Sequence, residues 1–195
     1  MAFNINEIKS QLALGGARPS LFQVRLSNPA TTEADSVVPF MVKASQIPAS
    51  TIAPIEVFYF GRPIKLAGQR IFDNWTVTVI NDEDFKVRKA LETWSYNINS
   101  YSGNIREFPT AAPSEYKARA EVIQYSKTGE ELRTYVFEGI FPLAIGPIEL
   151  SWENGNAIEE FQCEFALDYW TVPADGQFNR DQLSFRKNIR IGVHT

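Results

Sequence analysis

Apolar and polar residues alternate along several short stretches of this 195-residue chain. In residues 74–80, Trp75, Val77 and Val79 fall on one face, as expected of a strand with one buried side. Residues 158–170 follow the same period of two, and their apolar face carries Phe161, Cys163, Phe165, Leu167 and Tyr169. The alternation therefore predicts two strands, each of which buries one face.

Further strands are expected where β-branched and aromatic residues cluster between turn signals. These runs are residues 21–26, 37–44, 55–60, 116–125, 132–141 and 148–152. The turn signals are residues 60–63, 67–70, 126–129 and 154–155, and residues 28–36 (NPATTEADS) are expected to form a surface loop. Strands joined by turns this short pair in antiparallel fashion.

One substantial helix is predicted at about residues 82–100. Val87, Leu91, Trp94 and Ile98 recur there at helical spacing and form one apolar stripe, and Asn81 or Asp82 can cap its start. A short helix is also expected within residues 4–14, before two glycines. The fold class is therefore mainly β: an antiparallel β-sandwich or barrel with one docked α-helix.

The charge balance does not indicate a nucleic-acid-binding surface. The net charge is −4, apolar residues make up 44% of the chain and charged residues 22%, which are globular values. The charges are uneven, because residues 143–170 hold six acidic residues and no lysine or arginine. No apolar run reaches the 18 residues or so of a membrane span, no secretory signal is visible, and the single cysteine fits a reducing compartment.

Groups able to carry out catalysis are scarce. The only histidine, His194, is next to the last residue, and Cys163 lies in an apolar strand face, where a buried structural thiol is expected. No motif for phosphate, dinucleotide or zinc binding occurs. We therefore expect no enzyme, no catalytic residue, and no cofactor or metal site. A different class stays open, a carbohydrate-binding β-sandwich using Trp75, Trp94, Trp152 and Trp170.

The segment Ser45–Pro54 (SQIPASTIAP) is too apolar for an idle loop and too rich in proline for a core strand. An exposed apolar loop of this kind is typical of a contact with another protein. The alternative is a loop packed over its own barrel.

Several segments, in order, carry a resemblance to a known family. They are Arg18–Val24, Lys43–Ala49, Gly61–Gly68, Arg70–Asp82, Ser114–Lys117 and Phe165–Trp170. Over roughly residues 17–170 the chain resembles the tail tube protein of contractile-tailed bacteriophages. Residues 1–170 would then be the tail tube β-barrel domain and residues 171–195 a C-terminal extension.

The resemblance implies a structural virion protein of the phage tail, assembled in the host cytoplasm. Protomers of this family form hexameric rings that stack into a tube inside a contractile sheath. The implied partners are further copies of the chain, the tail sheath protein, the baseplate and the tape-measure protein. The genome passes through without specific binding, and no membrane is involved. Type VI secretion tube proteins share the fold, and a baseplate protein that initiates the tube is the alternative within it.

Three expectations about surfaces come from the residues themselves, placed in the assembly that the resemblance implies, although the role of residues 171–195 does not follow from the family. The ring-stacking interface is expected at Ile47, Pro48, Ala49, Ile52, Pro54 and Ile55. The lumen is expected to be lined by Glu160, Gln162, Glu164 and Asp168, because carboxylates do not hold DNA phosphates as a basic lining would. The alternative for these four residues is an outward, solvated face. The extension 171–195 is expected to lie on a neighbouring subunit or on the outer surface, a disordered tail being the alternative.

Overall fold

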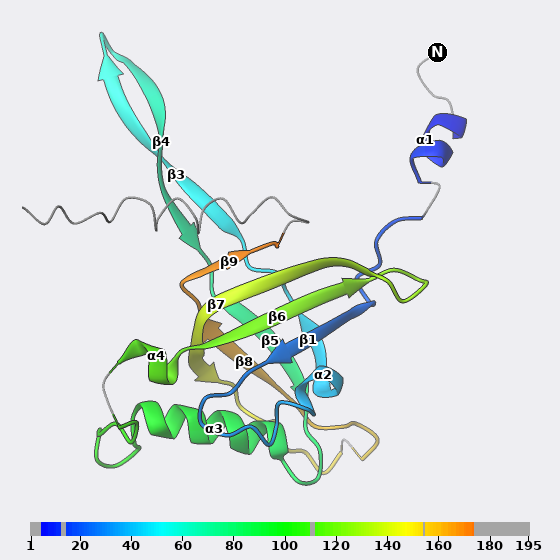
Figure 1. Cartoon of the computed structure of the whole chain (residues 1–195), viewed down its shortest axis with the longest axis vertical. Coiled ribbons are helices and arrows are strands. Elements are labelled where there is room, and N and C mark those ends of the chain that lie inside the picture. The colour runs from blue at the N-terminus through cyan, green and yellow to red at the C-terminus, as the bar shows by residue number, and fades with distance from the viewer. Residues whose placement is uncertain (1–4, 13–14, 110–111, 154, 174–195) are drawn as a thin grey trace, which may run out of the picture.

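The computed structural model describes residues 5–12, 15–109, 112–153 and 155–173, and Figure 1 shows their arrangement. The elements in chain order are α1 (Ile5–Gln11), β1 (Phe22–Leu26), α2 (Val38–Met41), β2 (Val42–Ser45), β3 (Ser50–Tyr59), β4 (Arg62–Phe72), β5 (Trp75–Ile80), α3 (Lys86–Ile98), α4 (Pro113–Tyr116), β6 (Ala118–Tyr125), β7 (Glu131–Ile145), β8 (Glu160–Ala166) and β9 (Tyr169–Thr171).

One seven-stranded antiparallel sheet wraps around the core. Its strands follow the order β1-β6-β7-β8-β5-β2, with β9 paired to β7 beside that path. Strands β1 and β2, at the two ends of the path, come into contact, so the sheet curves toward a barrel. Helix α3 lies across one end of this barrel (Figure 1). The expected mainly β fold with one docked helix is confirmed.

Strand β7 is the element that joins the two halves of the sheet. Its first half pairs with β6 and β9, and its second half pairs with β8. Gly139 lies between the halves with a φ of 68°, a region that residues with a side chain rarely adopt. A Cβ at this position would collide with the carboxylate of Asp168, which pairs with Lys117 Nζ at 2.6 Å. The bend therefore depends on the absence of a side chain at 139.

We expect Gly139→Ala to lower the free energy of unfolding by about 2 kcal/mol, from backbone strain plus displacement of Asp168. Gly129→Ala is the matched control, because Gly129 also has a positive φ, of 83°, but has open space around its Cα. Urea denaturation of both variants measures the difference. Equal losses in the two would show that the contact with Asp168 is unimportant.

The core is formed by alternating strand positions and the inner face of α3. Trp75 is fully buried, and its ring centroid lies 4.9 Å from that of Phe137 and 5.2 Å from that of Phe165. Helix α3 buries Val87, Ala90, Leu91 and Trp94. The Trp94 indole donates a 2.8 Å hydrogen bond to the carbonyl of Tyr116, which ties the helix to α4. The apolar faces predicted for residues 74–80 and for the helix are thus confirmed.

Asp82 caps α3, but it lies more residues before the start of the helix than the sequence suggests. The helix begins at Lys86, and the Lys86 backbone N–H donates to Asp82 Oδ1 at 2.9 Å. Phe85, the residue at the N-cap position, adopts a left-handed conformation with a φ of 54°. The acidic residues therefore form a turn before the helix rather than its first turn.

Several of the expected local structures are wrong. Residues 37–44 are not one strand, because Val38–Met41 forms the short helix α2, in whose first turn Pro39 is favourable. Residues 148–152 form no strand. The expected surface loop 28–36 is partly internal: Ala34 joins the core, and the buried Asn28 amide donates to the carbonyl of Ala90 at 3.1 Å.

The long strand expected over residues 158–170 is interrupted. Strand β8 ends at Ala166, and a turn at Leu167–Asp168 leads into β9, which pairs with β7. Phe161, Cys163 and Phe165 are buried as predicted, but Tyr169 is largely exposed because the period of two is broken before it.

Candidate assembly surfaces

The hairpin of β3 and β4 stands away from the barrel (Figure 1). It forms a separate two-stranded sheet. Its strands, of 10 and 11 residues, are longer than most strands in globular proteins. At its base Phe72 packs edge to face against Trp170, with 6.0 Å between the ring centroids.

Residues 67–70 lie inside β4, so the turn expected there is wrong. Gln69 is accommodated instead by a register shift opposite Ala53.

Both faces of the hairpin carry apolar cross-strand pairs, and the face with Pro54, Phe58 and Pro63 also carries an ion pair. On one face Ile55 lies opposite Leu66, and Val57 lies opposite Ile64. These four side chains are adjacent, with no polar residue between them, and each is about half exposed to solvent. On the other face Glu56 lies opposite Lys65, and the two form an ion pair at 3.8 Å. An isolated hairpin with an apolar face is marginally stable in water, so this face is suited to burial against another surface.

The tip of the hairpin is a two-residue turn. Phe60 and Gly61 both have positive φ, 45° and 77°, as in a type I′ turn, where Asn-Gly is preferred. A phenylalanine in this conformation is strained, and its ring is 90% exposed. Tyr59 packs edge to face on it at 4.5 Å between centroids. The turn therefore presents an aromatic pair at the far end of the hairpin.

Exposed large apolar residues concentrate on this hairpin. The nine in β3, β4 and their turn are Ile52, Ile55, Val57, Phe58, Tyr59, Phe60, Ile64, Leu66 and Ile71. Such a concentration of exposed apolar side chains on one element is typical of a protein–protein interface. Helix α1 adds Ile5 and Ile8, also exposed, and Figure 1 shows this helix away from the barrel.

The structure separates the six residues expected at the stacking interface. Pro48 is buried and Ile47 packs against the core of its own protomer. Ala49, Ile52, Pro54 and Ile55 are exposed, the last three on β3. The apolar residues at 57–60 and at Ile64 and Leu66 were not included in the expected interface. Their only sequence signal is the run Phe58-Tyr59-Phe60 before Gly61-Arg62-Pro63, which also fits a core strand followed by a turn.

A second, polar surface lies on the outer face of β8 and β5. Glu160, Gln162 and Glu164 point away from the core, opposite in sense to Phe161 and Cys163. Thr78 lies beside Gln162 and Thr76 beside Glu164 in the pairing with β5. The period of two predicted from the sequence is therefore confirmed for this strand.

The carboxylates of this face have more ion-pair and hydrogen-bond partners than the sequence suggests. Glu160 pairs with Lys43 Nζ at 2.5 Å, and Glu164 accepts a 2.7 Å hydrogen bond from Asn74 Nδ2. Asp168 is separate from them, because it follows the end of β8 and pairs with Lys117. Lys117, just before β6, thus neutralises Asp168, although β6 pairs with β7 and not with β8.

The four tryptophans do not form a platform. Trp75 and Trp94 are buried, Trp170 is half-buried and Trp152 is fully exposed on another segment. A flat sugar-stacking surface made of these residues is therefore absent from the described ranges.

The Cys163 thiol is buried, and desolvation raises its pKa to about 12. It stays protonated at neutral pH and has little nucleophilic character. Within residues 5–173, apart from the short gaps, no cluster of three or more His, Cys, Asp or Glu side chains could hold a metal ion. Among the described helices, none has both the length and the apolar character needed to cross a membrane.

Comparison with known proteins gives a consistent result. The family described as phage tail tube protein matches residues 7–173. Tail tube protein gp19 of Enterobacteria phage T4 is 37% identical over 155 residues, which cover 79% of this chain and 90% of that protein. The tail tube protein of Serratia phage KSP90 is 24% identical over 177 residues, covering 88% and 97% of the two chains.

Solved structures agree on the fold. A chain of the sheath-tube complex of an extracellular contractile injection system matches with a TM-score of 0.56 and 16% identity, covering 89% of this chain and all of that one. The tube-terminating cap of the anti-feeding prophage matches with a TM-score of 0.59 and 17% identity, covering 82% and 92%. At these identities the similarity concerns the fold.

Proposed function

We propose, because the chain belongs to the phage tail tube protein family, that it builds the tube of a contractile tail from hexameric rings stacked through the β3–β4 hairpin. The family resemblance seen in the sequence is confirmed, and the protein is a structural component of the phage tail. The hexamer, the stacking and the residues involved belong to the proposal. We also propose that the protein acts by assembly and not by catalysis.

The observation that carries this proposal is the apolar face of the hairpin. Burying a half-exposed aliphatic side chain contributes about 1 kcal/mol, so the two pairs Ile55–Leu66 and Val57–Ile64 together contribute roughly 4 kcal/mol per contact. In a hexameric ring this contact is repeated by every subunit, so the contributions accumulate when one ring stacks on another. The fold similarity to a sheath-tube complex and to a baseplate supports a sheath and a baseplate as partners. The tape-measure protein belongs to the proposal only as a partner that the family resemblance implies.

Negative-stain electron microscopy of the purified full-length protein tests the proposal. We expect six-membered rings or tubes at high protein concentration. A monodisperse monomer at all concentrations would contradict self-assembly. Rings that never elongate would instead favour a tube-initiating role.

We further propose that the polar face of β8 and β5 lines the lumen. Glu160, Gln162 and Glu164 present two carboxylates and a neutral amide, none of which neutralises phosphates or releases their counterions as lysine or arginine would. Asp168 stands apart from this face, and its role in the lumen rests on the position of the neighbouring copies. The compensation of Glu160 by Lys43 leaves the face weakly acidic and hydrated.

Reversing the charge of this face is expected to slow DNA ejection. Glu160→Lys with Glu164→Lys changes each subunit by four charges, and we expect tubes to form but ejection to slow roughly tenfold at low salt, less at high salt. Glu130→Lys with Glu131→Lys, at the exposed β6–β7 turn, is the control of equal charge. The measurement is the rate of DNA ejection from virions that carry each variant. Equal rates in the two variants would place the face outside the lumen.

A further inference from the structure

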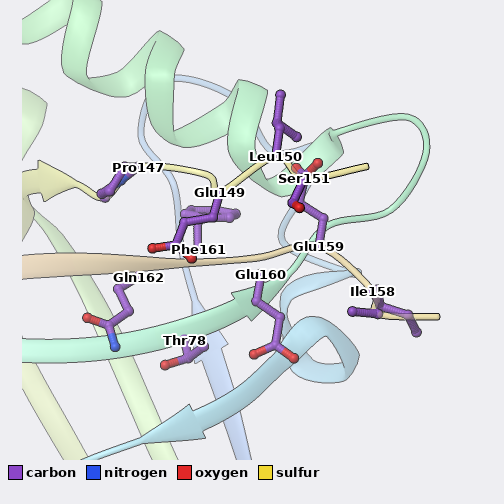
Figure 2. Close-up of a pocket in the computed structure, with 12 residues that line it drawn as sticks. Thr78, Pro147, Glu149, Leu150, Ser151, Ile158, Glu159, Glu160, Phe161 and Gln162 are labelled. Carbon is purple, nitrogen blue, oxygen red and sulfur yellow. The ribbon is translucent and has the colours of Figure 1, made fainter. Parts of the chain in front are cut away.

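An open groove lies where the chain enters β8. Its walls come from residues 146–151 and 157–162 together with Thr78 of β5, and its volume is about 540 Å³. Figure 2 shows Glu160 and Gln162 projecting from the same side of β8, while Glu149, Leu150 and Ser151 belong to the preceding segment. The groove is open to solvent along its length, so that an extended peptide can enter it.

The groove is acidic. Glu149, Glu159 and Glu160 line it, and no lysine or arginine does so. Glu159 accepts a hydrogen bond from Asn81 Nδ2, and Glu160 pairs with Lys43. Neither Glu149 nor the nearby Glu153 has a cation partner in the described ranges. Two carboxylates of this groove region are therefore available to a basic ligand.

Leu150 and Ile158 of its lining, and Trp152 next to the lining residue Ser151, are apolar side chains that the protomer leaves in solvent. Leu150 is 84% exposed, Ile158 is 69% exposed and Trp152 is fully exposed. These residues lie on an irregular segment, away from the apolar hairpin. A ligand that is both basic and apolar would thus match the groove region in charge and in polarity.

Residues 182–191 (QLSFRKNIRI) have this character. They lie outside the described residues, so only their sequence is used. Leu183, Phe185, Ile189 and Ile191 occupy odd positions, and Arg186 and Arg190 occupy even ones. In an extended peptide the two sets face opposite sides. Three cations and no acid occur in these ten residues.

We propose that residues 182–191 of one copy dock in the groove of a neighbouring copy, against its wall of residues 146–151, so that Glu160 and Gln162 on the other wall still face the lumen. Strand β8 begins at the groove and runs away from it, and the chain leaves the barrel after β9. There Trp170 packs on Phe72 at the base of the hairpin that would contact the next copy. The described chain thus ends beside the proposed neighbour, beyond the end of β8 that is opposite its own groove. The 22 residues after Pro173 can span at most about 75 Å, enough to cross to another protomer.

The inference depends on the proposed function in one respect: two copies of the chain must come into contact. Disulfide trapping on the full-length chain tests it, with Ser151→Cys in the groove and Ser184→Cys in the extension carried on separate copies. The native Cys163 is buried and has a raised pKa, so it does not compete. We expect a covalent dimer only when the two variants are mixed. Ser114→Cys, on the exposed part of α4, replaces Ser151→Cys in the control and should give at least tenfold less dimer.

Charge reversal supplies the second measurement. Glu149→Arg with Glu153→Arg in the groove variant should reduce the dimer at least tenfold, and Arg186→Glu with Arg190→Glu in the extension variant should restore it. Circular dichroism checks that each variant is folded.

Three results would overturn the inference. They are equal yields with the Ser114→Cys control, no effect of charge reversal, and trapping only within one chain that carries both cysteines. Tubes that form without the cross-link would leave the proposed function intact. A cross-link without tubes would argue against the proposed function alone.

Discussion

Val57→Asp with Ile64→Asp is expected to give a folded protomer that forms no tubes. The two residues lie opposite each other on the apolar face of the hairpin, outside the barrel, so the core is unaffected. In an assembled tube the substitution removes about 2 kcal/mol of apolar burial and adds the cost of burying carboxylates. The combined loss of at least 3 kcal/mol raises the critical concentration for assembly more than 100-fold. Sedimentation and electron microscopy measure it.

The opposite face of the hairpin provides the control. Glu56→Gln with Lys65→Gln removes an exposed ion pair without changing the apolar face, and exposed pairs contribute little. Tube yield should therefore stay close to that of the unsubstituted protein. If the aspartate variant assembled as well as this control, the hairpin would not be the stacking element. Ile47 is unsuitable for this test, because it packs against its own core.

The tip of the hairpin separates folding from assembly in another way. Phe60→Asn places the preferred Asn-Gly pair in the type I′ turn, so the hairpin itself should become slightly more stable. The aromatic surface is lost, and the critical concentration should rise about tenfold. Unchanged assembly would show that Phe60 makes no contact between copies.

Trp75→Ala is expected to lower the free energy of unfolding by about 3–5 kcal/mol. The side chain is fully buried between Phe137 and Phe165, and its indole donates a 3.0 Å hydrogen bond to Ser45 Oγ. Its removal leaves a cavity where the two halves of the sheet meet. Urea denaturation should be measured in the Val57→Asp, Ile64→Asp background, because assembly would otherwise add to the apparent stability.

Trp152→Ala is the matched control for this substitution. Trp152 is fully exposed, so its replacement should change the stability of the protomer by no more than about 0.5 kcal/mol. A similar loss in both variants would mean that the core is not organised around Trp75.

Much of the barrel could be predicted from the sequence because its signals are local. The alternation around Trp75 and in residues 161–165, and the stripe from Val87 to Ile98, follow from the geometry of a strand and a helix alone. The turn at residues 126–129 likewise depends on a few neighbouring residues. Several matching segments in order were also sufficient to indicate the family.

The candidate surfaces were predicted less well, because burial depends on distant parts of the chain. Residues 55–60 were predicted as a strand, but their sequence does not show that β3 and β4 pair only with each other and leave the barrel. Pro48 reads as part of an exposed loop, yet it is buried. The bend at Gly139 and the ion pair of Lys117 with Asp168 join residues far apart in sequence.

The sequence by itself thus determined the strand-rich class, the inward faces of the main strands and of the helix, and the family. These follow from side-chain periodicity and from residue order, both of which are properties of the unfolded chain. Only the tertiary structure decided which apolar runs stay exposed and which carboxylates find a cation. Exposure and pairing are set by what the rest of the chain brings next to each residue.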